Sequence, residues 1–252
     1  MADPGNRLAT DEPRSPWLRG GFVLAAAFIG FVTVIAGAVV FTSDPAAPAN
    51  GAATSELPAG RVAVPKPSSP SAEGPCPKLS DTRQDVPVTA PRGVTWTLFG
   101  AVAVPTSGRS GPAVAGKDVA RCYARTPVGA LLAASQISVR YLAADDWRKV
   151  TRLQTVGAGR DAYVAARTKA EKQSSADRDG GAHGQIAGFR FVTYQASTGV
   201  IQTVWRFPDG RMQAATTTVL WQDGDWRLEY PADPVAPTPV GSLAGYTEWG
   251  GV

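Results

Sequence analysis

An uncharged stretch near the N-terminus constrains this chain more than any other feature. Residues 21–41 read GFVLAAAFIGFVTVIAGAVVF, in which Thr33 is the one polar side chain. As a helix that rises 1.5 Å per residue, this stretch covers about 30 Å, which is the thickness of the hydrocarbon core of a bilayer. A helix that is apolar on every face is typical of a membrane span. The sequence therefore predicts a transmembrane helix over residues 20–42.

The charges on either side of this helix predict its orientation. Arg7, Arg14 and Arg19 precede it, whereas no Lys or Arg follows it before Arg61. Because positive residues stay on the cytoplasmic side, residues 1–19 are predicted to be cytoplasmic and the rest of the chain extracytoplasmic. A cleaved signal peptide is the alternative, but its apolar core is normally about 7–15 residues long. We therefore expect an uncleaved signal-anchor and a single-pass protein of the cell membrane.

Small side chains recur on one face of the predicted membrane helix. They are Ala26, Gly30, Thr33 and Gly37, at positions i, i+4, i+7 and i+11. Such faces let two helices approach closely in lipid. The spacing predicts pairing of this helix with a second copy, although an Ala- and Gly-rich helix also shows such spacing by chance.

Two segments contain few large apolar side chains. Residues 43–85 are rich in Pro, Ala and Ser, and this composition buries too little surface to offset the entropy lost on ordering. We expect residues 43–85 to form a disordered linker, an extended and partly polyproline-like stalk.

Residues 232–252 form a tail that is rich in Pro and Gly. Tyr246 and Trp249 in this tail favour docking onto the folded domain over a free end.

The folded domain is predicted between these segments, over residues 86–231. A first strand is expected over 94–104, and an antiparallel meander closes the domain, with strands at 189–195, 200–207, 211–221 and 225–230. Thr126 and Pro127 suit the N-cap and first position of a helix. Strands and helices that are segregated in this way indicate an α+β fold, with helices packed on one face of a curved antiparallel sheet.

Two shorter helices are expected between the first helix and the meander. Asp145 or Asp146 is the N-cap of the second helix, in which Trp147 and Val150 share one face. The third helix follows two glycines and covers about residues 160–172. The pair of acids is interpreted as helix capping and not as a catalytic pair of carboxylates.

The sequence lacks the residues that most catalysis requires. His183 is the only histidine and lies in a Gly-rich loop, so neither a metal site nor a His-based triad can be built around it. There is no phosphate-binding loop, dinucleotide fingerprint or nucleophile elbow. The net charge of +4 is spread along the chain without a basic run. We expect a protein that is not an enzyme, takes no metal or cofactor and does not contact nucleic acid directly.

Cys76 and Cys122 are the only cysteines, and both follow the predicted membrane helix. An oxidising compartment permits a disulfide between them. That bond closes a loop of about 47 residues, which corresponds to roughly 3–4 kcal/mol of stabilisation if the effect is entropic. The alternative is an exposed free thiol at Cys76 and a buried one at Cys122.

The end of the predicted meander carries a motif, Trp-x-x-Gly-Asp-Trp-x-Leu, made of Trp221, Gly224, Asp225, Trp226 and Leu228. A long helix, short helices and a meander with this closing hairpin resemble the cystatin-like cone of the nuclear-transport-factor-two superfamily. Three blocks are similar to uncharacterised proteins of actinobacterial integrative elements: residues 91–105 (PRGVTWTLFGAVAVP), 120–124 (ARCYA) and 126–131 (TPVGAL).

An anchor, a stalk and such a domain together resemble the conjugation-channel proteins of Gram-positive bacteria and the scaffolds of type IV secretion machines. The resemblance implies a non-enzymatic scaffold subunit of a conjugative transfer or type IV-like secretion apparatus. Its expected partners are the lipid bilayer, further copies of itself and other membrane proteins of the machine. The alternative is an envelope domain that binds a small apolar ligand or a lipid in its cone. Enzymes of the superfamily use an acid or a His at the cone mouth, which this sequence does not show.

Overall fold

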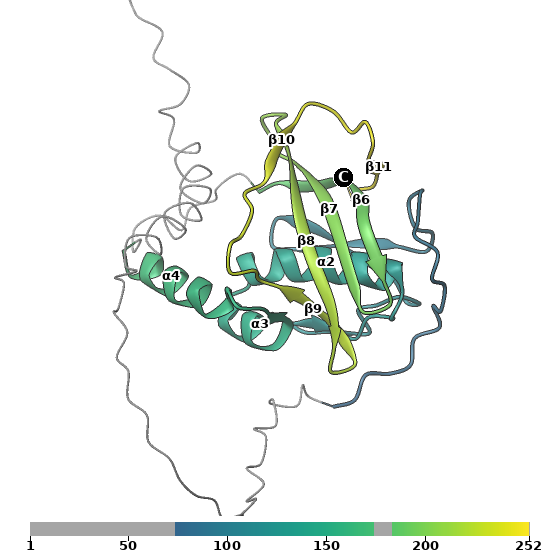
Figure 1. The fold of residues 1–252 in the computed structure, drawn as a ribbon, viewed down its shortest axis with the longest axis horizontal. Coiled ribbons are helices and arrows are strands. Elements are labelled where there is room, and N and C mark those ends of the chain that lie inside the picture. Colours follow the sequence, from purple (N-terminus) through teal and green to yellow (C-terminus); the bar gives the residue numbers. More distant parts are fainter. Residues whose placement is uncertain (1–73, 174–182, 252) are drawn as a thin grey trace, which may run out of the picture.

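An antiparallel meander of four strands forms the centre of the computed structural model, which describes residues 74–173 and 183–251 (Figure 1). The strands are β6 (Gln185–Gln195), β7 (Thr198–Arg206), β8 (Met212–Gln222) and β9 (Asp225–Glu229). Three short strands extend this sheet: β5 (Thr155–Val156), β10 (Thr238–Val240) and β11 (Thr247–Glu248). β5 pairs with β9, β10 with β8, and β11 with β6.

The turn between β8 and β9 owes its shape to two residues in the left-handed region. Asp223 has φ 52° and Gly224 has φ 78°. A two-residue turn with positive φ at both positions matches the right-handed twist of the strands, and Asp-Gly is a preferred pair for it. The turn places Trp221 opposite Trp226. The hairpin predicted from the Trp-Gly-Asp-Trp motif is therefore present.

Three helices occur in the described residues: α2 (Pro127–Ala143), α3 (Trp147–Gln154) and α4 (Arg160–Gln173). Thr126 is the N-cap of α2 and accepts a hydrogen bond from the Gly129 N–H at 3.1 Å. Asp146 is the N-cap of α3 and accepts from Lys149 N–H at 2.9 Å. α2 lies across one face of the meander, and α3 and α4 continue from its end (Figure 1). The predicted α+β class, with helices on one face of a curved sheet, is confirmed.

Large apolar side chains fill the space between α2 and the sheet. Seven of them have no exposed surface: Leu131, Leu132, Ile137, Phe189, Ile201, Val219 and Trp226. Trp226 also satisfies its one polar atom, because its indole N–H donates to the Ala124 carbonyl at 2.9 Å. Trp226 therefore fills the core without leaving its indole N–H unpaired.

The segment predicted as one strand over residues 94–104 is a hairpin instead. β1 (Thr95–Phe99) pairs with β2 (Val102–Thr106), and the chain turns at Gly100, which has φ 58°. The hairpin is fixed to β6, since the Ala103 N–H donates to Gln185 Oε1 at 2.9 Å. A continuous apolar run cannot reveal this turn, because Gly100 is flanked by strand-forming residues on both sides. A second small pair, β3 (Val114–Ala115) and β4 (Ala120–Arg121), precedes α2.

The folded part is longer at both ends than the predicted range of 86–231. Residues 74–93, here called the arm, cross the predicted linker boundary and bury Asp81 to 4% exposure. Residues 232–251, here called the tail, contribute β10 and β11. Trp249 of the tail is 5% exposed and packs its ring 5.3 Å from that of Phe189. Both ends are thus part of the domain.

No helix within residues 74–173 or 183–251 is long and apolar enough to cross a membrane. The predicted transmembrane helix (20–42), its small-residue face at Ala26, Gly30, Thr33 and Gly37, and the predicted cytoplasmic residues 1–19 lie outside the described residues.

The docked tail generates a stability prediction. Replacing Trp249→Ala should lower the free energy of unfolding by about 3–5 kcal/mol, because it removes a buried indole from the core. Val235→Ala is the matched control, since Val235 of the same tail is 85% exposed and should change stability by less than about 0.5 kcal/mol. Urea unfolding of both variants measures the difference, and equal midpoints would contradict a docked tail.

Candidate functional site

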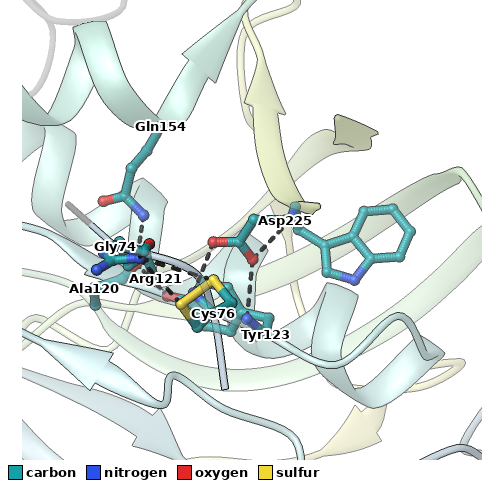
Figure 2. The surroundings of a disulfide bond; sticks show 9 residues. Gly74, Cys76, Ala120, Arg121, Tyr123, Gln154 and Asp225 are labelled. Carbon is teal, nitrogen blue, oxygen red and sulfur yellow. Dashed lines mark hydrogen bonds between the residues drawn. A yellow bond between two sulfur atoms is a disulfide. The ribbon is translucent and has the colours of Figure 1, made fainter. Parts of the chain in front are cut away.

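A disulfide joins the start of the arm to the chain just before α2 (Figure 2). The Cα atoms of Cys76 and Cys122 are 5.3 Å apart, at a sequence separation of 46. Cys122 is 1% exposed, and its φ of 71° lies in the left-handed region, which is rare for a residue other than Gly. Arg121 donates to the Gly74 carbonyl at 3.2 Å and so holds the first described residue against β4. The structure thus pairs the two cysteines and leaves no free thiol among its described residues.

The Asp225 carboxylate lies beside this disulfide and accepts three backbone hydrogen bonds (Figure 2). The donors are the N–H groups of Cys122 at 2.7 Å, Tyr123 at 2.9 Å and Trp226 at 2.9 Å. Burial raises the pKa of Asp225, and the three backbone donors offset that rise only in part. Asp225 therefore ties the closing hairpin to the segment that leads into α2.

These residues do not form a metal site. Among the described residues, one group of metal-ligand types lies close together, namely Cys76, Cys122 and Asp225, with ligand atoms within 4.8 Å of one another. Metals bind the thiolate form of cysteine, and both sulfurs here are joined to each other. The carboxylate is also occupied by its three backbone donors. Cys76, Cys122 and Asp225 therefore hold segments of the fold together and do not bind a metal.

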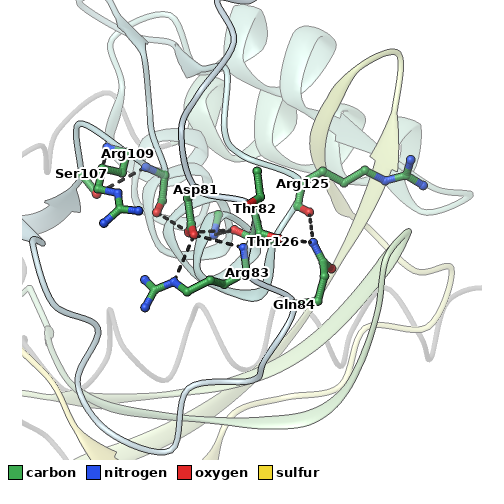
Figure 3. A network of polar contacts seen from close by, with 10 residues as sticks. Asp81, Thr82, Arg83, Gln84, Ser107, Arg109, Arg125 and Thr126 are labelled. Carbon is green, nitrogen blue, oxygen red and sulfur yellow. Dashed lines mark hydrogen bonds and ion pairs between the residues drawn. The ribbon is translucent and has the colours of Figure 1, made fainter.

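A second buried carboxylate, Asp81, fixes the middle of the arm (Figure 3). It accepts from the hydroxyls of Ser110 at 2.7 Å and Thr126 at 3.2 Å, and its backbone N–H donates to Arg109 O at 3.1 Å. Burial raises the pKa of Asp81, but hydrogen bonds from Ser110, Arg83 and Thr126 outweigh burial, so the net pKa lies below its ordinary value. The ionised Asp81 carboxylate therefore holds the arm against Ser110 and Thr126.

The arm then follows the outer strand of the meander. Gln84 donates to the Arg125 carbonyl at 2.9 Å and accepts from the Tyr194 hydroxyl at 3.1 Å (Figure 3 shows Gln84 and Arg125). Further along, Val88 O accepts from the Thr247 hydroxyl at 3.2 Å, where β11 joins the sheet. The arm thus runs from the start of α2 to the tail. No pattern along the sequence indicates these contacts, because each joins residues that are far apart in the chain.

Two grooves border the tail, one beside the arm and β1 and the other beside β6 and β7. The first has a volume of about 390 Å³ and lies between the arm and the tail, against Pro91, Trp96, Glu248 and Trp249. The second has a volume of about 620 Å³ and lies on the other side of the tail, next to Arg206 and Phe207. Glu248, Trp249 and Gly250 border both grooves. Both grooves are open at the surface and lie outside the packed layer of α2 and the sheet.

The histidine and the acid pair singled out in the sequence lie apart from one another. His183 is exposed and borders the second groove. Asp146 caps α3, while Asp145 forms an exposed ion pair with Lys117 at 2.8 Å. The structure therefore brings none of these residues together into a catalytic group. The sequence does not predict the first groove, although Trp249 in the tail favours docking onto the domain.

The disulfide generates the second prediction. Cys76→Ser should lower the free energy of unfolding by roughly 3–4 kcal/mol, because the unfolded chain regains the entropy of the opened loop. A reductant should produce the same loss in the parent protein and none in the variant, as followed by urea unfolding. If the parent protein kept its unfolding midpoint in reductant, the bond would not stabilise the fold.

The Asp81 network generates the third prediction. Because its pKa is lowered in the folded state, the carboxylate stabilises the fold above its ordinary pKa of 3.8, and this stabilisation is lost as the pH falls through the folded value. Asp81→Asn should therefore cost about 1–3 kcal/mol at neutral pH, and the deficit should shrink at about pH 2–3.

Urea midpoints at the two pH values measure this difference. Asp85→Asn, on an exposed acid of the same arm, is the control and should stay within about 0.5 kcal/mol of the parent at both pH values. A deficit for Asp81→Asn that is independent of pH would show that the carboxylate charge has no part in holding the arm.

Comparisons with known proteins give a family but no characterised relative. A family model described as "Domain of unknown function (DUF8175)" matches residues 56–248, which is well over half of the chain. No curated protein and no solved structure matches the chain. The family match begins before the first described residue and ends within the tail, so it includes the arm, the meander and β11. The chain therefore belongs to the DUF8175 family, a family defined by a domain of unknown function.

Proposed function

We propose that the protein is a non-enzymatic, membrane-anchored scaffold subunit of a conjugative transfer or type IV-like secretion apparatus. Its extracytoplasmic domain is a cystatin-like cone that acts through contacts with other proteins. The observation that carries this proposal is the filled interior of the domain.

A cone that binds a small ligand or a substrate keeps an open space between its helix and its sheet. In this domain that space holds Leu131, Ile137 and Trp226, which have no exposed surface. Neither groove is lined by a residue of α2: the groove at Trp96 lies between the arm, β1 and the tail, and the groove at Phe207 lies between β6, β7 and the tail. This arrangement favours an interaction domain over the alternative of a small apolar ligand or lipid held inside the cone.

The buried acids support the same conclusion. Asp81 and Asp225 are the buried carboxylates of the described residues. A catalytic acid needs access to a substrate. Here Asp225 is occupied by three backbone N–H groups and Asp81 by two hydroxyls. Both carboxylates thus hold chain segments together, which favours a role without catalysis.

The order of elements agrees with a cystatin-like cone. The long helix α2 precedes the two shorter helices, and the meander β6 to β9 closes with the Trp221–Trp226 hairpin. Bulges between Ile186 and Gly188 and between Phe191 and Thr193 increase the bend of β6. Strand bending of this kind wraps a sheet around one helix.

The disulfide supports an extracytoplasmic position for the domain. Disulfides persist in oxidising compartments and are rare in the cytosol. The uncharged stretch at residues 21–41 and the arginines before it would place the domain outside. Membrane attachment and export are thus favoured by two independent features of the chain.

The fourth prediction concerns partners. Full-length tagged protein, solubilised from the membranes of its native host in mild detergent, should co-purify with other membrane proteins of the transfer or secretion machine, as identified by mass spectrometry. The matched control carries residues 1–73 of this chain on an unrelated folded domain, so it keeps the anchor and stalk. Equal recovery of these proteins by both baits, or recovery of the chain alone, would contradict a scaffold function of the domain.

A further inference from the structure

The Cys76–Cys122 disulfide has one exposed end and one buried end. Cys76 is exposed at the start of the arm, whereas Cys122 is 1% exposed. In thiol–disulfide exchange a thiolate attacks one sulfur of the bond, and the other sulfur leaves as a thiolate. A thiolate that arrives from solvent therefore meets Cys76, and Cys122 becomes the leaving group.

A guanidinium group lies against both sulfurs of the bond (Figure 2). Arg121 Nη1 donates to Cys122 Sγ at 3.3 Å and to Cys76 Sγ at 3.8 Å. A neighbouring arginine stabilises a thiolate, and a thiol that ionises more easily is a faster leaving group. Arg121 is thus placed to stabilise the negative charge that forms on Cys122 when the bond breaks.

The Asp225 carboxylate has the opposite effect on this charge. Its nearest oxygen lies within 4.8 Å of both sulfurs, so its negative charge disfavours a thiolate at Cys122. Three backbone N–H groups already bond to this carboxylate, and they offset part of its charge. Because Arg121 is in direct contact with the sulfurs, its removal would leave the Cys122 thiolate beside an acid without that cation.

The buried half of the disulfide is held in place by its backbone. The Cys122 N–H donates to Asp225 at 2.7 Å, and the Cys122 carbonyl accepts from the Ala113 N–H at 2.9 Å. Neither hydrogen bond involves the sulfur. Cys122 should therefore keep its position after the bond is cleaved, ready to form the bond again.

The exposed half is held less firmly. Cys76 is joined to the domain by its sulfur, and Gly74 by its carbonyl, which accepts from Arg121 at 3.2 Å. Along the described part of the arm, the next hydrogen bonds are those of Asp81. Cleavage of the disulfide should therefore release residues 74–80 and leave the rest of the arm bound.

We propose that this disulfide is a site of thiol–disulfide exchange, in which a dithiol attacks Cys76 and Arg121 stabilises the departing Cys122 thiolate. The bond between the two cysteines breaks, and a mixed disulfide forms between Cys76 and the dithiol. The second thiol of the dithiol then attacks the mixed disulfide, and Cys76 leaves as a thiolate. Both cysteines end reduced, having taken up the two protons of the dithiol, and the dithiol is oxidised to its own disulfide.

Exchange at this site changes how the domain is attached to the chain before it. Residues 74–80 span at most about 25 Å when extended, so their release lengthens the preceding segment by up to that distance. Asp81 sets the end of the released part. This proposal goes beyond the proposed function and does not depend on which machine the protein serves.

Trapping the mixed disulfide tests the fifth prediction. Full-length protein in mild detergent is mixed with reduced glutathione, quenched with excess N-ethylmaleimide, digested with trypsin and analysed by mass spectrometry. Glutathione should occur on the peptide with Cys76 and the maleimide on the peptide with Cys122. The same reaction in urea is the control and should place glutathione on both cysteines. Glutathione on Cys122 of the folded protein, equal labelling of both cysteines or no adduct would overturn the proposal.

Replacement of Arg121 tests the leaving group. Arg121→Gln should slow reduction by dithiothreitol roughly threefold to tenfold, because the Cys122 thiolate loses its cation. A purely structural role predicts the opposite sign, since loss of the bond to Gly74 would loosen the arm and speed reduction. Arg121→Lys keeps the charge and should be slowed less than Arg121→Gln. Arg92→Gln removes a charge from an exposed position of the arm and should reduce at the parent rate.

The rates are measured by the alkylation of free thiols over time. An unchanged or faster rate for Arg121→Gln would overturn the assignment of Arg121.

Limited proteolysis tests the release of the arm. Dithiothreitol should speed tryptic cleavage after Lys78 roughly tenfold, because a detached segment enters a protease more easily, and should leave cleavage after Arg92 unchanged. Cys76→Ser should be cleaved rapidly after Lys78 with or without dithiothreitol. Unchanged cleavage after Lys78 would contradict the release, and faster cleavage after Arg92 would show that Asp81 does not limit it.

Discussion

The fold depends on one buried carboxylate that joins distant parts of the chain. Asp225 accepts from the backbone of Cys122 and Tyr123, 103 and 102 residues away, and from its own hairpin at Trp226. Backbone N–H groups that are buried need a partner, and without Asp225 the left-handed segment at Cys122 would lack one. The closing hairpin, the disulfide and the start of α2 all meet at this point, so the positions of the helix and of the arm follow from it.

Because the core is filled, a ligand or partner protein can bind only at the surface of the domain. Trp226 is fully buried between α2 and the sheet and donates its indole N–H to Ala124 O. The two ends of the folded part border the surface grooves: the arm and the tail line the first together with β1, and the tail lines the second together with β6 and β7. Both are tied down by a few specific contacts, Cys76 and Asp81 in the arm and Trp249 in the tail. Ends fixed in this way can form a rigid surface although their sequences resemble linkers.

Local features of the sequence predicted much of the fold and little of the candidate site. The sequence predicts Thr126 as one N-cap and Asp145 or Asp146 as another, of which the structure has Asp146, and it predicts the Asp223-Gly224 turn and the meander, because each depends on residues that are neighbours in the chain. The turn at Gly100 was missed, since its flanking residues favour strands equally well. The roles of Asp81 and Glu248 had no local signal, because their surroundings are assembled from the arm, the tail and the loops before α2.

The sequence by itself determined that this chain has an uncharged stretch long enough to span a bilayer, a Pro-rich segment, two cysteines and an α+β domain without the residues of common catalytic sites. These properties depend on composition and on periods of a few residues. Only the tertiary structure decided that the interior is filled, that Cys76 meets Cys122, and that Trp96 and Trp249 face one groove. The physical reason is that packing and register act between residues distant in sequence, and the pattern along one segment does not record which other segment will cover it.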